Sequence, residues 1–128
     1  MLRLTRPLYQ AAKSSTGITG LAVHRDPLPS LERKYESTLK ALEALPATSV
    51  YRQGAEALTR HKLNIVKASN GDVGAVEKQL NEGQIEESLL IAGDELSLAS
   101  KMAEWKAWEP LEEKPERGQW EYPSTSET

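Results

Sequence analysis

One segment, residues 84–105, constrains the fold of this chain more than any other part of its sequence. Its apolar residues recur in steps of four and three, and they are Ile85, Leu89, Ala92, Leu96, Ala99 and Ala103. Because an α-helix has about 3.6 residues per turn, this spacing places all of these side chains on one face. Such a seam is typical of a helix that packs in a bundle. We therefore expect a helix from about Gln84 to Trp105.

Helical periodicity extends to three further segments. The first begins at Ser30, an expected N-cap, and Pro46 ends it, while Pro27 and Pro29 are expected to keep the preceding chain extended. Its apolar face consists of Leu31, Tyr35, Thr38, Leu42 and Leu45. A second helix is expected over residues 49–68 and a short one over residues 73–81. The inner face of the second consists of Tyr51, Ala55, Leu58, Ile65 and Val66.

These segments predict an all-α fold, a small antiparallel bundle of about three long helices plus one short helix. At 128 residues the chain is long enough for one domain with a modest core. We expect a basic N-terminal segment over residues 1–29, the helical bundle over residues 30–108 and an extended tail over residues 109–128. The tail contains prolines at 110, 115 and 123, which rule out a long helix there.

A second apolar stripe lies on the last predicted helix, away from the first seam. It consists of Ile91, Leu98, Met102 and Trp105. Each helix of a small bundle touches two neighbours, so this stripe could pack inside the bundle. Alternatively, it packs on another protein, and the sequence leaves both readings open.

Catalytic and metal-binding chemistry has little support in the composition. The chain has no cysteine, and its two histidines, His24 and His61, are far apart in sequence. The acidic residues of the last helix, Glu86, Glu87, Asp94 and Glu95, mostly fall on its polar arc. No histidine accompanies them as a di-metal carboxylate site requires, so we expect a solvated face. We predict no catalytic residues, no cofactor and no metal site.

The charge is distributed unevenly along the chain. Residues 1–25 contain four basic and no acidic residues, whereas the rest carries twelve basic and nineteen acidic residues, a net charge of −7. An acidic body argues against nucleic-acid binding. Leu4 and Leu8 alternate with Arg3 and Arg6 at helical spacing, which is typical of a mitochondrial targeting segment. A frayed basic tail is the other reading, and whether the segment is cleaved stays open.

Both ends of the bundle carry residues suited to binding a partner. Gly17 and Gly20 interrupt the apolar stretch TGITGLAV at residues 16–23, which also contains Leu21. At the other end, all three tryptophans lie in the final quarter of the chain, and tryptophan is enriched at interface hot spots. The candidate partner-binding residues there are Trp105, Trp108, Pro110, Leu111, Trp120 and Tyr122. The sequence also allows Trp105 and Trp108 to cap the bundle's own core.

Several short motifs, in this order and spacing, resemble one known family. They are TGITGLAV at 16–23, Tyr35, Leu45-Pro46, VYR at 50–52, EGQIEE at 82–87 and EWKAWEPL at 104–111. The chain resembles the NADH dehydrogenase (ubiquinone) 1 alpha subcomplex subunit 5 family, accessory subunits of mitochondrial respiratory complex I. The resemblance covers about Thr16 to Leu111. Ala107 stands where the family commonly has proline, which bears on docking details.

The resemblance implies a non-catalytic bundle of about three helices. It implies a place on the matrix-facing peripheral arm of complex I, beside the core subunits of the quinone-reducing module, with a role in assembly and stability. Flavin, iron–sulfur clusters and quinone would belong to neighbouring subunits, and attachment to the inner membrane would be peripheral, through the complex. A free assembly chaperone is the alternative function.

Overall fold

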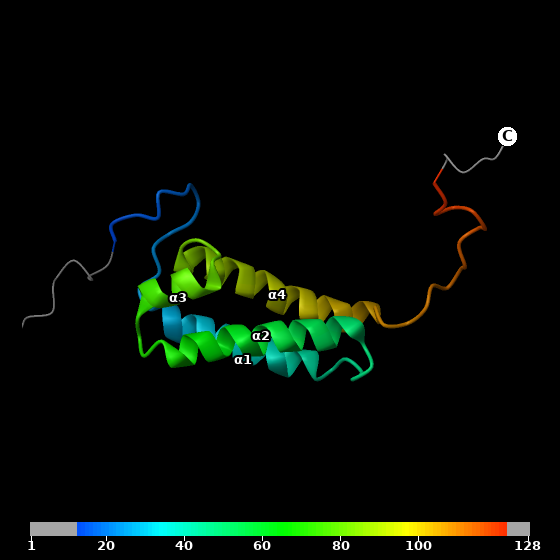
Figure 1. The fold of residues 1–128 in the computed structure, drawn as a ribbon, viewed down its shortest axis with the longest axis horizontal. Coiled ribbons are helices and arrows are strands. Elements are labelled where there is room, and N and C mark those ends of the chain that lie inside the picture. The colour runs from blue at the N-terminus through cyan, green and yellow to red at the C-terminus, as the bar shows by residue number, and fades with distance from the viewer. Residues whose placement is uncertain (1–12, 123–128) are drawn as a thin grey trace, which may run out of the picture.

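The computed structural model describes residues 13–122 of the chain. Four helices follow one another: α1 (Pro27–Leu42), α2 (Val50–Ala68), α3 (Val73–Leu80) and α4 (Ile85–Trp105). The three long helices lie side by side, and the short α3 lies at one end of the bundle (Figure 1). The described segments before α1 and after α4, residues 13–26 and 106–122, extend from opposite ends of the bundle (Figure 1). Residues 13–122 contain no strand, and the all-α prediction of three long helices and one short helix is confirmed.

The first helix begins three residues before the predicted start. Ser30 was expected as the N-cap, but α1 begins at Pro27 and Asp26 precedes it. Both Pro27 and Pro29 therefore lie in the first turn, where backbone N–H groups have no intrahelical partner to lose. The expectation that these prolines keep the chain extended was wrong for this reason.

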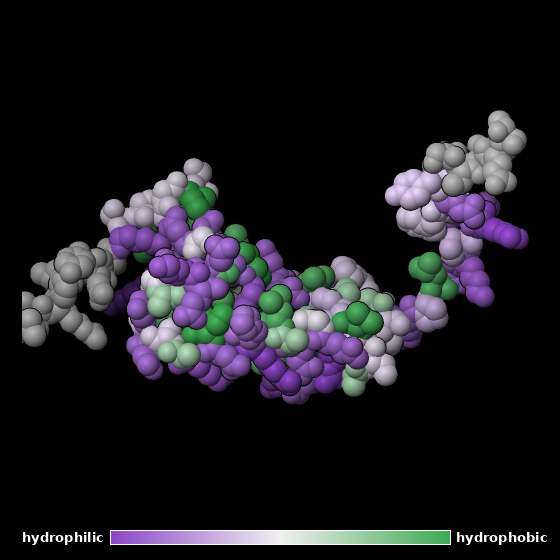
Figure 2. All heavy atoms as spheres, viewed as in Figure 1, coloured by the Kyte–Doolittle hydropathy of each residue, from purple (hydrophilic) through white to green (hydrophobic). Residues whose placement is uncertain are grey.

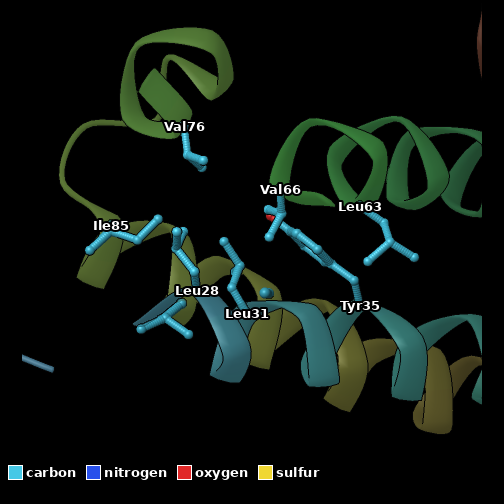
Figure 3. Packing of buried hydrophobic residues seen from close by; sticks show 9 residues of the cluster. Leu28, Leu31, Tyr35, Leu63, Val66, Val76 and Ile85 are labelled. Atoms are coloured by element: carbon cyan, nitrogen blue, oxygen red, sulfur yellow. The ribbon is translucent and has the colours of Figure 1, made fainter. Parts of the chain in front are cut away.

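Helix α1 is the centre of the bundle, because it packs against both α4 and α2. From α1, Leu31 and Tyr35 meet Leu63 and Val66 of α2 in the larger core cluster (Figure 3). The remaining members of that cluster are Leu28, Val76, Ile85, Leu89 and Ala92. A smaller cluster of Leu42, Leu45 and Ala99 closes the other end.

The seam predicted for the last helix is confirmed. Four of its six residues, Ile85, Leu89, Ala92 and Ala99, are buried, and the other two are half-buried. In α2, by contrast, the buried residues are Thr59, Leu63 and Val66. Leu58, predicted to face inward, is 55% exposed. The physical reason is that α2 packs on α1 through the face that carries Thr59, Leu63 and Val66. Leu58 lies one residue before Thr59, beside this face, and therefore points toward solvent.

Candidate functional site

Apolar side chains of α4 remain exposed beside the core-facing seam. Ile91 is 43% exposed, Leu98 38% and Trp105 63%. The fourth member of the predicted stripe, Met102, is half-buried and packs against the smaller core cluster. The bundle therefore leaves most of this stripe uncovered by residues 13–122. On the face seen in Figure 2, apolar patches lie along the helices among polar side chains.

Between α2 and α4 lies a groove, and α1 forms its floor. Its cavity volume is about 240 Å³. The residues that line it are Tyr35, Thr38, Tyr51, Gly54, Ala55, Leu58, Thr59, Lys62, Ile91, Ala92 and Glu95. Across the groove the Tyr51 hydroxyl donates a hydrogen bond to Glu95 Oε1 at 2.6 Å. Burial raises the pKa of Tyr51, and this hydrogen bond to a carboxylate raises it further.

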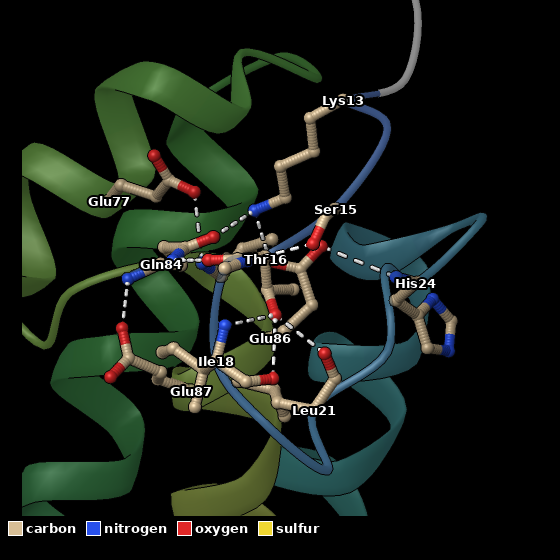
Figure 4. Close-up of polar contacts among 12 residues, drawn as sticks. Lys13, Ser15, Thr16, Ile18, Leu21, His24, Glu77, Gln84, Glu86 and Glu87 are labelled. Atoms are coloured by element: carbon tan, nitrogen blue, oxygen red, sulfur yellow. Dashed lines mark hydrogen bonds and ion pairs between the residues drawn. The ribbon is translucent and has the colours of Figure 1, made fainter.

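An N-terminal strap, residues 13–25, fastens to the start of α4 (Figure 4). Lys13 Nζ lies 2.7 Å from Gln84 Oε1 and 2.5 Å from Glu86 Oε2. Gln84 Nε2 in turn donates to the Thr16 carbonyl oxygen at 2.7 Å. The Thr16 hydroxyl donates to the Leu21 carbonyl oxygen at 2.5 Å and so closes a compact loop. These contacts attach the strap to the bundle of its own chain.

The carboxylate that anchors this strap, Glu86, is buried, with 3% of its side chain exposed. The expectation of a solvated face was wrong here, because the strap covers this part of α4. Burial alone would raise the pKa of Glu86. The hydrogen bonds from Lys13 Nζ and from backbone amides, including that of His24 at 3.3 Å, outweigh it and hold the pKa below its ordinary value. No local sequence pattern signals this pair, which spans 73 residues.

The predicted N-terminal contact residues divide into two groups. Gly17 and Gly20 are exposed and have φ of +72° and +81°, a left-handed conformation that glycine adopts at little cost. Leu21 is half-buried and accepts the Thr16 hydrogen bond. Contact of this loop with a partner chain stays a prediction. The residues of the predicted targeting segment, Arg3, Leu4, Arg6 and Leu8, lie outside the described residues.

The C-terminal tail carries the most exposed aromatic side chains. Trp120 is 86% exposed, and Tyr122 and Leu111 are 83% and 74% exposed. Nearer the bundle, Trp108 is 36% exposed and Pro110 is exposed. A role for these residues in docking stays a prediction.

Within residues 13–122, no three His, Cys, Asp or Glu side chains come together in a group that could hold a metal ion. His61 is exposed on α2, whereas the His24 ring accepts a hydrogen bond through Nδ1 from the Asp26 amide at 3.0 Å. None of the helices in this part of the chain is long and apolar enough to span a membrane.

The motif EGQIEE at 82–87 is the junction where strap, α2, α3 and α4 meet. Glu82 forms an ion pair with Lys62 of α2. Glu87 Oε2 accepts a hydrogen bond from the Gln84 amide at 2.7 Å, which completes a capping box at the start of α4. Gln84 and Glu86 hold the strap, so four of the six residues of this motif make polar side-chain contacts to a neighbouring segment or to the helix start.

Known proteins match this chain over most of its length. A family described as "ETC complex I subunit conserved region" matches residues 20–87. The NADH dehydrogenase (ubiquinone) 1 alpha subcomplex subunit 5 of Bos taurus is 46% identical over 111 residues, covering 87% of this chain and 95% of the bovine protein. The chain belongs to this subunit 5 family.

Relatives from other kingdoms agree with this assignment. The NADH dehydrogenase (ubiquinone) 1 alpha subcomplex subunit MCI4 of Candida albicans is 47% identical over 123 residues, which cover 94% of this chain and 88% of that protein. A probable mitochondrial subunit 5 of Arabidopsis thaliana is 42% identical over 103 residues, or 80% of this chain and 60% of the plant protein. The family resemblance drawn from the sequence motifs is confirmed.

Proposed function

We propose that this chain is a non-catalytic accessory subunit of mitochondrial NADH:ubiquinone oxidoreductase, respiratory complex I. The observation that carries the proposal is family membership, with a bovine subunit 5 that matches over 95% of its own length. We place the chain on the matrix-facing peripheral arm, beside the core subunits of the quinone-reducing module. Its attachment to the inner membrane is peripheral and runs through the complex.

In this proposal the chain supports its neighbours through its surfaces and performs no chemistry. The bundle presents Ile91, Leu98 and Trp105 along α4, and the tail presents Trp108 and Trp120, all partly or largely exposed. Exposed aromatic side chains of this kind supply much of the binding energy at protein interfaces. We also propose that the chain is divided into three functional parts: the N-terminal segment, the helical bundle and the extended tail.

The test uses the full-length chain with an epitope tag, expressed in cells that lack their own copy. The chain should comigrate with assembled complex I on native gels, and it should stay with the peripheral arm when mild detergent releases the membrane arm. Recovery with the membrane arm would refute the proposed location. Recovery mainly as a free species of low mass would favour the alternative function, a free assembly chaperone.

Import into mitochondria is tested separately. Residues 1–12, proposed here as part of a targeting segment, are deleted, and the variant should remain in the cytosol. Mass spectrometry of the mitochondrial form then shows whether the native segment is trimmed. Normal import of the deletion variant would refute the targeting role.

A further inference from the structure

The groove between α2 and α4 is open to solvent along a face that the bundle does not need for its own core. Its rims carry apolar side chains, Leu58 at 55% exposure and Ile91 at 43%. The floor consists of Tyr35 and Thr38 of α1, both buried. Two helical walls and a helical floor leave a site of the shape that a fourth long helix fills in a bundle.

Gly54, on the α2 wall, has no evident role within the chain. It lies inside a helix, where glycine is less favourable than alanine. A Cβ added to it would meet no atom within 4 Å, and its φ is not positive. Neither crowding nor backbone conformation among residues 13–122 therefore requires glycine here. A helix that approaches α2 closely from outside would require it, because a side chain at this position would keep the two backbones apart.

Glu95, on the α4 wall, lacks a cationic partner in the described part of the chain. Within residues 13–122 its side chain accepts one hydrogen bond, from the Tyr51 hydroxyl. Lys62, the basic residue of the groove lining, pairs with Glu82 instead. Asp94 beside it is exposed and has no ion pair within residues 13–122 either. Glu95 is therefore the acidic residue of the groove lining that no cation of residues 13–122 neutralises, and a partner that covers it gains from carrying a basic side chain there.

The exposed stripe continues the groove along α4 with a regular repeat. Ile91, Leu98 and Trp105 are seven residues apart, and Glu95 and Met102 are also seven residues apart. Together they form a second seam in steps of four and three, the spacing with which one helix packs lengthwise against another. An extended peptide has no such periodicity to match.

We propose that this groove binds one amphipathic helix of another complex I subunit. The helix approaches α2 closely at Gly54, places aliphatic side chains between Leu58 and Ile91, and pairs a lysine or arginine with Glu95. This inference rests on the proposed function, since it takes the partner from the same complex. To the proposed function it adds which surface of this chain is bound, that the bound segment is a helix, and that this helix carries a basic residue.

The first test replaces Gly54 by alanine and uses Gly74→Ala as the matched control. Gly74 also lies in a helix, and an added Cβ there meets one atom at an ordinary 3.5 Å, outside the groove. Both purified variants should melt at or above the wild-type temperature. In cells that co-express wild-type chain under a second tag, G54A should be about tenfold under-represented in assembled complex I, as overpacking a tight interface predicts. G74A should compete equally.

The second test removes the charge of Glu95 and leaves an acceptor for Tyr51. Glu95→Gln should lower incorporation in the same competition about tenfold, and Glu95→Lys further, as loss of a close interfacial charge pair predicts. Glu43→Gln, at an exposed site just after α1, is the matched control and should compete equally. A photo-crosslinking residue at position 58 should then react with a helical segment of another complex I subunit, next to a basic residue.

Three results overturn the inference. They are equal competition by G54A and E95Q, crosslinks from position 58 to a second copy of this chain, and crosslinks confined to the chain itself. In each case wild-type chain still comigrates with complex I, so the proposed function stands and the groove assignment fails. If the wild-type chain itself does not comigrate, the proposed function fails and the groove assignment fails with it.

Discussion

At the scale of single residues, the burial of one carboxylate decides how the N-terminal strap is attached. The side chain of Glu86 is 3% exposed, and its Oε2 atom lies 2.5 Å from the Nζ atom of Lys13. A buried charge is costly unless it is paired and hydrogen-bonded. The strap satisfies both conditions, because Lys13 supplies the charge and the His24 amide supplies a further hydrogen bond.

We predict that Glu86→Gln lowers the free energy of unfolding at pH 7 by about 2 kcal/mol, since it removes hydrogen bonds to a charged group. The folded-state pKa of Glu86 lies below its ordinary value of 4.5. Its contribution is therefore fully present above that pH and is lost as the pH falls through the folded-state pKa.

Urea unfolding of wild type and E86Q across pH 3–7 measures this effect. The difference between the two stability curves should shrink toward acid pH. Glu112→Gln, in the exposed tail, is the control and should follow the wild-type curve. Parallel curves for wild type and E86Q would show that the Glu86 carboxylate does not hold the strap.

Tyr35 offers a second prediction at this scale. Tyr35 lies within the larger core cluster (Figure 3) and is 4% exposed. Its hydroxyl has no hydrogen-bond partner among residues 13–122. Burial, with a smaller contribution from the charge of Glu82, raises the pKa of this hydroxyl. Because a buried unpaired hydroxyl destabilises the fold, Tyr35→Phe should raise the free energy of unfolding by about 1 kcal/mol. A lower value in denaturant titration would mean that the hydroxyl has a partner.

At the scale of elements, the helix ends show how the chain turns with few residues. Asp72 caps α3 by accepting a hydrogen bond from the Ala75 amide at 3.2 Å. Asn81 ends α3 with φ of +54°, a conformation that asparagine tolerates better than most residues. Lys106 ends α4 in the same left-handed conformation, with φ of +51°. Lysine does not tolerate this conformation as well as asparagine or glycine does. The C-terminal end of α4 is therefore less stable than it would be with one of those residues at position 106.

Replacing Lys106 by glycine should therefore raise the free energy of unfolding by about 1 kcal/mol, because glycine adopts positive φ at little cost. Lys101→Gly, in the interior of α4, is the matched control and should lower it by about 1 kcal/mol. Thermal denaturation of the two variants gives the comparison. A loss of stability in both would show that α4 continues past Trp105 in solution.

At the scale of the whole molecule, most of the apolar surface that the core does not use lies along α4 and the tail. Because α1 packs against both α2 and α4, these two helices contact each other little, which exposes the groove and the Ile91–Leu98–Trp105 stripe. Trp108 and Trp120 of the tail add exposed apolar surface outside the four helices. A small bundle with so much exposed apolar surface is suited to a permanent place among other subunits.

Trp108→Ala should weaken incorporation into complex I by about 2 kcal/mol, the cost typical of a hot-spot residue. The measurement is competition with co-expressed wild-type chain. Denaturation of the purified variant separates a docking defect from a folding defect, since a docking residue leaves the free energy of unfolding close to the wild-type value. Unchanged incorporation would assign Trp108 to the rim of the interface.

Local periodicity was enough to predict the helices, their order and the core seam of α4. The residues on that seam, such as Leu89 and Ala99, repeat at the spacing of a helix, and burial of one face follows from that spacing alone. The motifs from TGITGLAV to EWKAWEPL were likewise enough to indicate the family. The start of α1 was missed by three residues, because prolines at 27 and 29 suit a first turn as well as an extended chain.

The sequence by itself thus determined the fold class, the main helical faces and the family. Only the tertiary structure decided that Glu86 is buried against Lys13, that Leu58 faces solvent, and that Gly54 and Glu95 line the same open groove. The physical reason is how far apart in the sequence the interacting residues lie. Helix formation and amphipathicity depend on residues three or four apart, whereas these pairings depend on how α1 separates α2 from α4 and on where a distant segment crosses α4.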